Sequence, residues 1–458
     1  MKNDTICAVS TPLGISGIGI VRLSGPDSYK IIGKIFRPAK KINISNIPTH
    51  TVHYGYIADG SRTVDEVLLT VMRRPRSYTR EDMAEIGCHG GIVPLKEVLS
   101  LCIKNGARQA EPGEFTERAF LNGRIDLVQA ESVLEVISSK TESALEISVK
   151  KLKGSFSSHL NDIQAALSGI LAEIEAKINF PEEEEIESLN LETAKKIDEL
   201  TAFIDGILSR AGRGKILRQG INAAITGRAN AGKSSLLNYL VKEDRAIVTD
   251  VPGTTRDAVQ ETVNVRGIPV NIIDTAGIRK VRGRIEKMGV DRAIEWMEKA
   301  EVNLIMLDGT KKINDYDRGL LSHIKGKNYI IMINKADMPQ KIDKKRIEKD
   351  FPSDRIAAIS AKTGAGIPEL EEKIYGLISM GHAEIKEDCI FLNMRQEGRI
   401  KEMRKKLLEI REEIKIGVTA DVIAESLKDC LKDIDELTGK NIAEDTLNSI
   451  FSRFCIGK

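Results

Sequence analysis

The segment INAAITGRANAGKSSLLNYLV, residues 221–241, decides the fold of the central part of this chain. Its residues 227–234 match the pattern G-x-x-x-x-G-K-[ST], the phosphate-binding P-loop, with an apolar strand-like run before it and a helix-like run after it. In such a loop, backbone N–H groups and the start of a helix face phosphate, the lysine reaches the β- and γ-phosphates, and the hydroxyl after it binds Mg²⁺. We therefore expect contacts to a bound nucleotide from Asn230, Ala231, Gly232, Lys233, Ser234 and Ser235.

A second motif, NKAD at residues 334–337, follows the apolar run YIIMI and selects the base. A carboxylate only accepts hydrogen bonds, so Asp337 can accept from both the ring N–H and the amine of guanine, a pair that adenine lacks. The stem of Lys335 can lie along the base. After another strand-like run, SAK at residues 360–362 supplies a loop beside the base. The residues expected around guanine are Asn334, Lys335, Asp337, Ser360, Ala361 and Lys362.

Two further segments are typical of a nucleotide switch. DTAG, residues 274–277, ends the run VNII, so its aspartate can hold the Mg²⁺ shell through water and its glycine N–H can meet the γ-phosphate. GTTRD, residues 253–257, offers a hydroxyl as a second Mg²⁺ ligand. These motifs, in this order, resemble the translation-factor class of small GTPases. The residues expected in the switch are Thr254, Thr255, Asp274, Thr275, Ala276 and Gly277.

One position departs from Ras-like proteins, in which a glutamine after the DxxG glycine orients the attacking water. This chain has Ile278 there, and an apolar side chain cannot hold water. Glu286, in the following segment, is a candidate for that task, although it is equally explained as an exposed helix carboxylate. Asn230 could hold a monovalent cation beside the phosphates, or simply bond to its own loop.

Composition limits the remaining possibilities. The 458 residues include 69 Lys+Arg and 67 Asp+Glu, a net charge of +2, which excludes a mainly electrostatic nucleic-acid coat. No apolar run is long enough for a transmembrane helix, and the N-terminus lacks the pattern of a signal peptide. The six cysteines are scattered without a CxxC pair, which favours reduced thiols in the cytoplasm.

The pattern of apolar runs and turn residues along the sequence predicts a multidomain chain with α+β, all-α and α/β parts. We expect an α+β domain over 1–121, a helical domain made of 122–215 and 383–458, and a P-loop GTPase domain over 216–382 inserted into it. The apolar positions from Ile147 to Ile178 recur every three to five residues and predict one long amphipathic helix, which Phe180-Pro181 ends.

The whole chain resembles the bacterial tRNA-modification GTPase family MnmE, also called TrmE. The resemblance rests on DTICAVSTPLGISGIGIVRLSG at 4–25, PGEFTERAFLNGRIDLVQAE at 112–131, the P-loop, GTTRD, DTAGIR with EKMG at 286–289, and FCIGK at 454–458. It implies an enzyme that installs an aminomethyl or carboxymethylaminomethyl group on C5 of the wobble uridine of certain tRNAs. It also implies a homodimer that forms a heterotetramer with a flavin-dependent MnmG-type partner.

The same resemblance assigns ligands and roles. It implies a K⁺ site at Asn230, Thr249, Val251 and Thr254, with Thr249 also near GTP, and K⁺-dependent dimerisation of the GTPase domains that activates hydrolysis. Mg²⁺ would be held by Ser234 and Thr255. The catalytic residues would be Glu286, Lys233 and the near-terminal Cys455. Glu286 would orient the attacking water. The other interpretation of Cys455 is that its side chain is a small buried hydrophobic group. A 5-formyl-tetrahydrofolate or related one-carbon folate would bind at Arg22, Glu85, Arg124 and Lys458.

Three other functions compete with this interpretation. An Era-like ribosome-assembly GTPase shares the nucleotide motifs but usually adds an RNA-binding KH module with a GXXG loop, which the helical tail here lacks. A membrane iron-transport GTPase needs transmembrane helices. A dynamin-like scaffold fits the helical segments but leaves the N-terminal motifs unexplained.

Overall fold

The computed structural model describes residues 4–40, 42–179, 186–243, 260–274, 294–379 and 389–458. The chain forms two compact units, each made of segments that are separated in sequence. Unit 1 comprises Met1–Glu135, Lys151–Ile197 and Lys406–Lys458, and unit 2 comprises Val136–Lys150 and Asp198–Lys405. The boundaries between the units fall inside helices, so the three-domain division at 121, 215 and 382 stays a prediction.

Unit 1 contains a seven-stranded sheet in the order β3-β4-β5-β6-β2-β1-β7, antiparallel except for the parallel pair β1/β7. The strands alternate buried and exposed side chains, as expected of a sheet covered on one face. Their bounds are β1 Ile6–Val9, β2 Ser16–Ser24, β3 Phe36–Pro38, β4 Thr51–Asp59, β5 Arg62–Met72, β6 Met83–Gly90 and β7 Arg108–Gln109.

Helices α1 (Ser28–Ile35) and α2 (Ile92–Lys104) cover one face of this sheet, and a short 3-10 turn, Ile44–Asn46, lies beside α1. Their apolar faces, including Ile32 and Leu95, pack with strand residues such as Leu69 into one buried core. The α+β character predicted for the N-terminal part is therefore present. The opposite face of the sheet leaves several large apolar side chains exposed, namely Val52, Tyr54, Tyr56 and Leu68.

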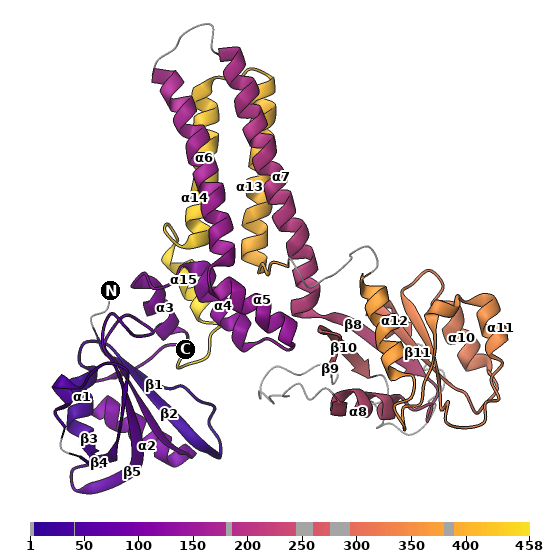
Figure 1. Cartoon of the computed structure of the whole chain (residues 1–458), viewed down its shortest axis with the longest axis horizontal. Coiled ribbons are helices and arrows are strands. Elements are labelled where there is room, and N and C mark those ends of the chain that lie inside the picture. The colour runs from indigo at the N-terminus through magenta and orange to yellow at the C-terminus, as the bar shows by residue number, and fades with distance from the viewer. Residues whose placement is uncertain (1–3, 41, 180–185, 244–259, 275–293, 380–388) are drawn as a thin grey trace. The chain divides into compact units, whose positions relative to one another are not determined.

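The remaining helices of unit 1 pack the C-terminal residues against the helices that follow the sheet in sequence. Phe451 and Phe454, from α15 (Glu444–Phe451) and the segment after it, pack against Ala119 of α3 (Glu114–Leu121) and Val133 of α4 (Leu127–Ile137). In Figure 1, α14 (Ala420–Thr438) runs beside α6 (Ser155–Asn179), and the two helices are in contact.

The single helix predicted from Ile147 to Ile178 is wrong. The structure has two helices there, α5 (Glu142–Leu152) and α6, separated at Gly154, whose φ of +98° lies outside the helical region. Glycine adopts that conformation without a steric cost, so it ends α5 although the apolar spacing continues through it. The Phe180-Pro181 stop lies outside the described residues.

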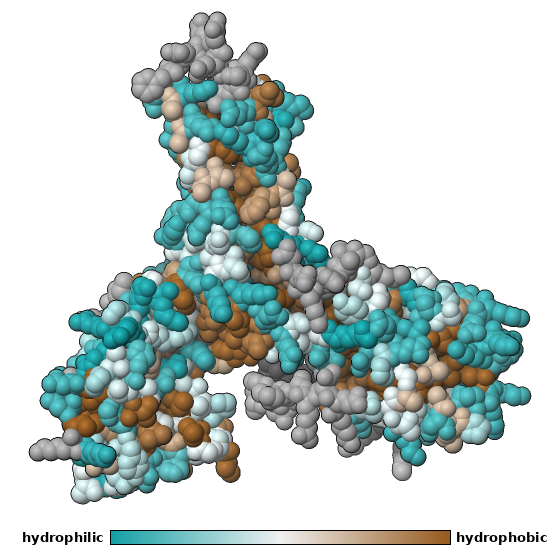
Figure 2. Space-filling model, in the orientation of Figure 1, coloured by the Kyte–Doolittle hydropathy of each residue, from teal (hydrophilic) through white to brown (hydrophobic). Residues whose placement is uncertain are grey.

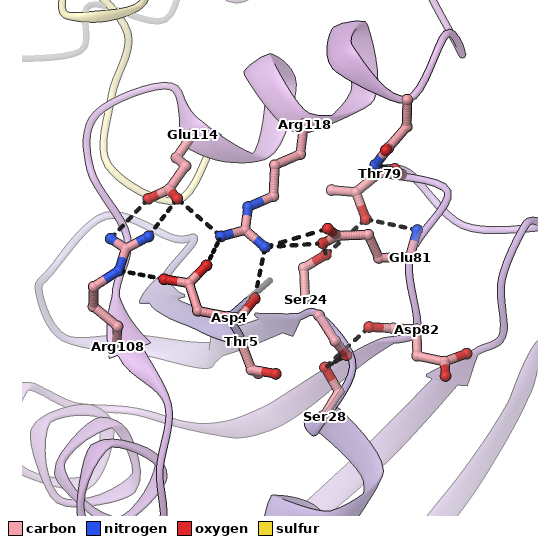
Figure 3. A network of polar contacts seen from close by, with 12 residues as sticks. Asp4, Thr5, Ser24, Ser28, Thr79, Glu81, Asp82, Arg108, Glu114 and Arg118 are labelled. Carbon is pink, nitrogen blue, oxygen red and sulfur yellow. Dashed lines mark hydrogen bonds and ion pairs between the residues drawn. The ribbon is translucent and has the colours of Figure 1, made fainter. Parts of the chain in front are cut away.

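An ion-pair network fastens β1 to α3 within unit 1 (Figure 3). Arg118, whose side chain is 8% exposed, donates to the Asp4 carboxylate at 2.6 Å, to Glu114 at 3.0 Å and to Glu81 at 3.2 Å. Arg108 donates to Glu114 at 2.6 Å and to Asp4 at 2.8 Å. Two guanidinium groups thus hold three carboxylates, and each carboxylate depends on an arginine for its charge balance.

This network predicts that unit 1 loses stability in acid. Burial raises the pKa of Asp4 and Glu114, but hydrogen bonds from Arg108 and Arg118 outweigh it and hold both below their ordinary values of 3.8 and 4.5. Groups with lowered pKa stabilise the fold above their unfolded pKa, and this contribution is lost as the pH falls through the native pKa. Hydrogen exchange at β1, corrected for the intrinsic rate, should therefore show an opening free energy that is constant from pH 8 to about 6 and falls below about pH 5. An opening free energy that stays unchanged down to about pH 3.5 would contradict this role of the network.

Unit 2 is built on a six-stranded sheet in the order β13-β12-β11-β8-β10-β9, parallel except for the antiparallel edge strand β9. The central strands are apolar along their length because both faces are covered, as in other parallel sheets. The strand bounds are β8 Ile221–Gly227, β9 Gln260–Val265, β10 Ile268–Asp274, β11 Val302–Asp308, β12 Tyr329–Asn334 and β13 Ile356–Ala358. The largely parallel sheet predicted for residues 216–382 is present.

The helices of unit 2 pack on both faces of this sheet, since its residues divide between two separate buried cores. One core contains Leu236 of α8 and Leu370 of α12, and the other contains Leu320 of α10 and Ile347 of α11. The bounds are α8 Lys233–Glu243, α10 Asp315–His323, α11 Lys344–Asp350, the 3-10 turn Ser353–Arg355 and α12 Ile367–Ser379. Two long helices, α7 (Ile186–Gln219) and α13 (Met394–Lys415), cross the unit boundaries. Among the described residues, no helix has the length and hydropathy to cross a bilayer.

Candidate functional site: a nucleotide cavity and an arginine-centred cluster

A cavity of about 590 Å³ lies at the carboxyl edge of the parallel sheet in unit 2, where ligands bind in α/β folds. The loop after β8, the end of β12 and the loop after β13 form its walls. Eleven of the predicted nucleotide-binding residues line it together with Met338, which the motifs did not indicate. They are Asn230, Gly232, Lys233, Ser234, Ser235, Asn334, Lys335, Asp337, Ser360, Ala361 and Lys362.

The P-loop has the backbone shape that a phosphate cradle needs. Gly227, Asn230 and Gly232 have φ values of +151°, +62° and +109°, so the chain turns sharply before α8 starts at Lys233. The Lys233 ammonium donates to the carbonyl oxygens of Gly227 at 2.7 Å and Arg228 at 2.8 Å, which holds it across the loop. A positive charge and a helix N-terminus thus face the same space, an arrangement suited to phosphate.

Asn334 connects the phosphate side of the cavity to the base side. It is 2% exposed; its amide nitrogen donates to the Ala231 carbonyl at 2.7 Å, and its amide oxygen accepts from the Ala361 N–H at 2.9 Å. Ala231 is itself fully buried beneath the loop, so it supports the cavity rather than lining it. A buried side chain with both of its polar atoms paired rigidifies the elements that it joins.

Asp337 is oriented by a buried hydroxyl. Ser360, fully buried, donates to the Asp337 carboxylate at 2.6 Å and accepts from the Thr363 N–H at 3.2 Å. This hydrogen bond is the main cause that lowers the pKa of Asp337, so the carboxylate is charged near neutral pH. A fixed carboxylate that only accepts hydrogen bonds recognises paired donors such as those of guanine.

The base-side lysine has a partner that the motifs did not indicate. Lys335, with φ +66°, donates to Asp308 at 2.8 Å, and Asp308 also accepts from the Thr310 hydroxyl at 2.6 Å. Burial raises the pKa of Asp308, but the bonds from Lys335 and Thr310 outweigh burial and lower it to about 2. The signal that could have indicated Asp308 is its place directly after the apolar strand VNLIML.

A second contact that the motifs did not indicate supports the P-loop through Arg228. Arg228 forms a two-pronged ion pair with Asp317, one arm at 2.8 Å, and donates to the Lys312 carbonyl at 2.9 Å. Asp317 is fully buried and also closes the capping box with Asn314 at the start of α10. The sequence gives no spacing rule for this pair, because the two residues come from separate βα units.

The other predicted switch and cation residues lie outside the described residues. They are Thr249, Val251, Thr254, Thr255, Thr275, Ala276, Gly277 and Glu286. Asp274 is the last residue of β10, and nothing beyond its backbone position is described.

Gly232→Ala should weaken nucleotide binding. A Cβ at this position would lie 2.0 Å from the Asn334 amide nitrogen, and the φ of +109° disfavours any side chain. Relieving that clash moves either the P-loop or Asn334, so we expect the Kd for GTP to rise about tenfold or more. Gly376→Ala in α12, with nothing within 4 Å, is the matched control. Equal GTP affinities of both variants, measured by fluorescence titration, would show that the loop tolerates the shift.

A second cluster forms in unit 1 around Arg22. Arg22 and Glu85 are directly opposite in the β2/β6 register and form an ion pair at 2.8 Å. Arg22 also donates to the Gly457 carbonyl at 3.1 Å, and its guanidinium lies 5.8 Å from the Tyr78 ring centroid. Arg124 lies over the same Tyr78 ring at 4.5 Å. The structure therefore brings together three of the predicted folate residues with the segment that carries the fourth, Lys458.

The C-terminal segment is fixed in unit 1 through its backbone. The Lys458 carbonyl accepts from the Phe115 N–H at 3.1 Å, and the Cys455 carbonyl accepts from the Gly113 N–H at 3.4 Å. Gly457 has φ +89° and lies so close to the Val9 carbonyl that a Cβ would be 2.4 Å away. The Cys455 side chain is exposed, so the buried-hydrophobe interpretation does not describe it. Its catalytic role stays a prediction.

Comparison with known proteins extends these observations to the whole chain. The model of the MnmE helical domain matches residues 127–455, and the model of the GTP-binding protein TrmE N-terminus matches residues 5–124. A tRNA modification GTPase MnmE of Thermoanaerobacter pseudethanolicus is 46% identical over 464 residues, covering 100% of both chains. The protein of the same description from Enterococcus faecalis is 40% identical, covering 100% of this chain and 99% of its own.

The solved structures that the chain resembles cover smaller shares of it. The G domain of the FeoB iron transporter of T. maritima is 25% identical with a TM-score of 0.27, covering 34% of this chain and 98% of its own. Aquifex aeolicus Era bound to GDP.AlF4- is 28% identical with a TM-score of 0.28, covering 41% and 67%.

The P-loop, the guanine-type base pocket and these full-length relatives define a GTP-hydrolysing enzyme of the P-loop class. More particularly, the chain belongs to the MnmE family of tRNA modification GTPases.

Proposed function

We propose that this chain, with a flavin-dependent MnmG-type partner, installs an aminomethyl or carboxymethylaminomethyl group on C5 of the wobble uridine of certain tRNAs. The observation that carries the proposal is the Arg22–Glu85 pair beside Tyr78 and the C-terminal segment, in a unit separate from the nucleotide cavity. A GTPase that acted only as a switch would have no use for a second site of this kind.

The cluster suits a one-carbon folate. The edge of a pterin ring presents donors to a carboxylate such as Glu85, and the carboxylates of the glutamate part pair with Arg or Lys. Tyr78, whose ring centroid lies 5.8 Å from the Arg22 guanidinium, offers an aromatic face for the flat ring system. In this arrangement Arg22 orients Glu85, and Arg124 and Lys458 bind the carboxylates of the folate's glutamate part.

Calorimetric titration with 5-formyl-tetrahydrofolate tests this assignment. Glu85→Gln keeps the shape of the side chain but replaces one acceptor by a donor, so we expect at least a tenfold loss of folate affinity. Glu97→Gln, at the exposed pair with Arg62, is the control. Wild-type protein that binds no folate, or a Glu85→Gln variant that binds it as tightly, would contradict the proposal.

For the GTPase reaction, Ser234 lines the cavity at the start of α8 beside Lys233, and its hydroxyl is a suitable Mg²⁺ ligand together with Thr255. The ion would neutralise charge on the β- and γ-phosphates. Asn230, whose φ of +62° turns it at the rim of the cavity, is the described member of the proposed K⁺ set with Thr249, Val251 and Thr254. K⁺-dependent pairing of two GTPase domains would then activate hydrolysis.

Glu286→Ala should separate binding from hydrolysis. If Glu286 orients the attacking water, its removal lowers kcat about a hundredfold and leaves the Kd for GTP within about twofold. Single-turnover hydrolysis in KCl and equilibrium binding of a non-hydrolysable GTP analogue measure the two effects. Unchanged turnover of Glu286→Ala in KCl would assign the water to another group.

The exposed sheet face of unit 1 supports a homodimer. Val52, Tyr54, Tyr56 and Leu68 are 59%, 46%, 37% and 50% exposed on the face opposite α1 and α2, and hydrophobic residues are visible on the surface of this unit in Figure 2. Contiguous exposed apolar residues mark association surfaces in soluble proteins. This face therefore supports dimerisation through residues 1–121. The proposal also includes folate binding by the same residues, a cytoplasmic location, and a heterotetramer with the flavin-dependent partner.

A further inference from the structure

The loop RRPRSYTRED, residues 73–82, joins β5 to β6 and gathers arginines beside the proposed folate cluster. Arg76 and Arg80 from this loop, Arg124 from the segment after α3, and His50, Ser77 and Tyr78 all line one shallow cavity of about 480 Å³. Neither the nucleotide site nor the four predicted folate residues account for Arg76 and Arg80. The cavity is a second concave surface whose lining is strongly cationic.

The guanidinium groups of this cavity have contacts that leave their charge unbalanced. Arg80 donates to the Asn122 carbonyl at 2.9 Å, and Arg124 donates to the Tyr78 carbonyl at 3.1 Å. Within the described part of the chain, Arg76, Arg80 and Arg124 form no ion pair with a carboxylate. The acidic residues of the same loop are engaged elsewhere: Glu81 accepts from Arg118 and Ser24, and Asp82 accepts from the Arg74 N–H.

The backbone around this cavity is also unusual. His50 and Arg80 both have φ of +60°, a conformation that side chains other than glycine rarely adopt. Five such residues occur in the described part of the chain; two of the others, Asn230 and Lys335, line the nucleotide cavity. Strained backbone of this kind concentrates at ligand sites, because the surrounding structure must hold it in place.

We propose that the Arg76, Arg80 and Arg124 cavity binds the oligo-γ-glutamate tail of the folate whose ring system occupies the Arg22–Glu85 cluster. This inference rests on the proposed folate function. Arg124 faces both sites, since it lines the cavity and also lies over the Tyr78 ring that Arg22 approaches. A tail that leaves the cluster past Tyr78 therefore enters the cavity directly.

The charges favour an extended tail over a single glutamate. A folate with one glutamate carries two carboxylates, and each further γ-linked residue adds one. The cavity has three guanidinium groups without a paired carboxylate, and each can bind one carboxylate through two parallel N–H donors. The monoglutamate has only two carboxylates, so it would leave at least one of these groups unpaired. The site therefore selects folates by tail length, with the ring contacts common to all of them.

Calorimetric titration of the full chain with 5-formyl-tetrahydrofolate carrying one and three glutamates tests the inference. Exposed arginine–carboxylate pairs contribute modestly, so we expect the triglutamate to bind about tenfold more tightly than the monoglutamate. The double variant Arg76→Ala, Arg80→Gly should abolish this difference while its monoglutamate affinity stays within about twofold of wild type. Glycine is chosen at position 80 because it accepts the φ of +60°.

Arg62→Ala, which removes an exposed arginine of the same unit paired with Glu97, is the matched control and should keep the tail-length preference. Hydrogen exchange at β1 that matches wild type shows that unit 1 of the double variant is folded. Equal affinity of wild type for both folates would overturn the tail site but leave the folate function standing, whereas binding of neither overturns both. A double variant that keeps the preference but binds tRNA more weakly would assign the arginines to the RNA backbone and overturn the inference.

Discussion

Asp337→Asn should convert the nucleotide preference from guanine to xanthine. The carboxylate of Asp337 accepts hydrogen bonds only, and the buried Ser360 hydroxyl holds it at 2.6 Å. In the variant, Ser360 can still donate to the amide oxygen, so the side chain keeps its place but presents one donor and one acceptor. Guanine then meets a donor opposite its own donor, while xanthine meets a matching pair.

We expect the Kd for GTP to rise at least a hundredfold and the Kd for xanthosine triphosphate to fall below it, because an unmatched polar group in such a site carries the full cost of its desolvation. Competition binding with a fluorescent guanine nucleotide measures both constants. Asp354→Asn, an exposed aspartate of the same unit outside the cavity, should change neither. A variant that retains tight GTP binding over xanthosine triphosphate would remove Asp337 from base recognition.

Arg118→Ala should strongly destabilise unit 1. Its guanidinium touches Asp4, Glu114 and Glu81, and its side chain is 8% exposed. Without it, Asp4 and Glu114 share only Arg108, and Glu81 loses its arginine partner. Removing one partner of a buried ion pair costs about 3–5 kcal/mol, and we expect about 3 kcal/mol here because Asp4 and Glu81 are partly exposed.

The opening free energy of β1, obtained from hydrogen exchange, measures this loss directly. Arg118→Lys keeps the charge without the planar fork and should recover part of the stability. Arg62→Ala removes an exposed arginine and should cost less than about 1 kcal/mol. If Arg118→Ala and Arg62→Ala have equal effects on β1, the network does not hold this strand to α3.

The nucleotide cavity was the more predictable of the two candidate sites. Its residues come from three short motifs, each of which follows a buried strand of one parallel sheet, so the topology alone brings them to one edge. Supporting residues such as Asp308 and Asp317 could not be predicted in the same way. Their partners, Lys335 and Arg228, are reached through side-chain packing, for which one sequence carries no spacing rule.

The Arg22 cluster could be located only through resemblance to a family. Arg22 and Glu85 become neighbours through the β2/β6 register, and Gly457 reaches them from more than four hundred residues away in the sequence. No local pattern encodes such contacts. The break between α5 and α6 at Gly154 was missed because apolar spacing continues across it, and the decisive signal was a single glycine.

The most direct test of the proposed function is mass spectrometry of tRNA nucleosides from cells that lack this chain. The proposal predicts loss of the C5-modified wobble uridines and their return when the intact gene is restored. Wobble uridines that are unchanged in its absence would contradict the proposal and leave a GTPase whose substrate lies elsewhere.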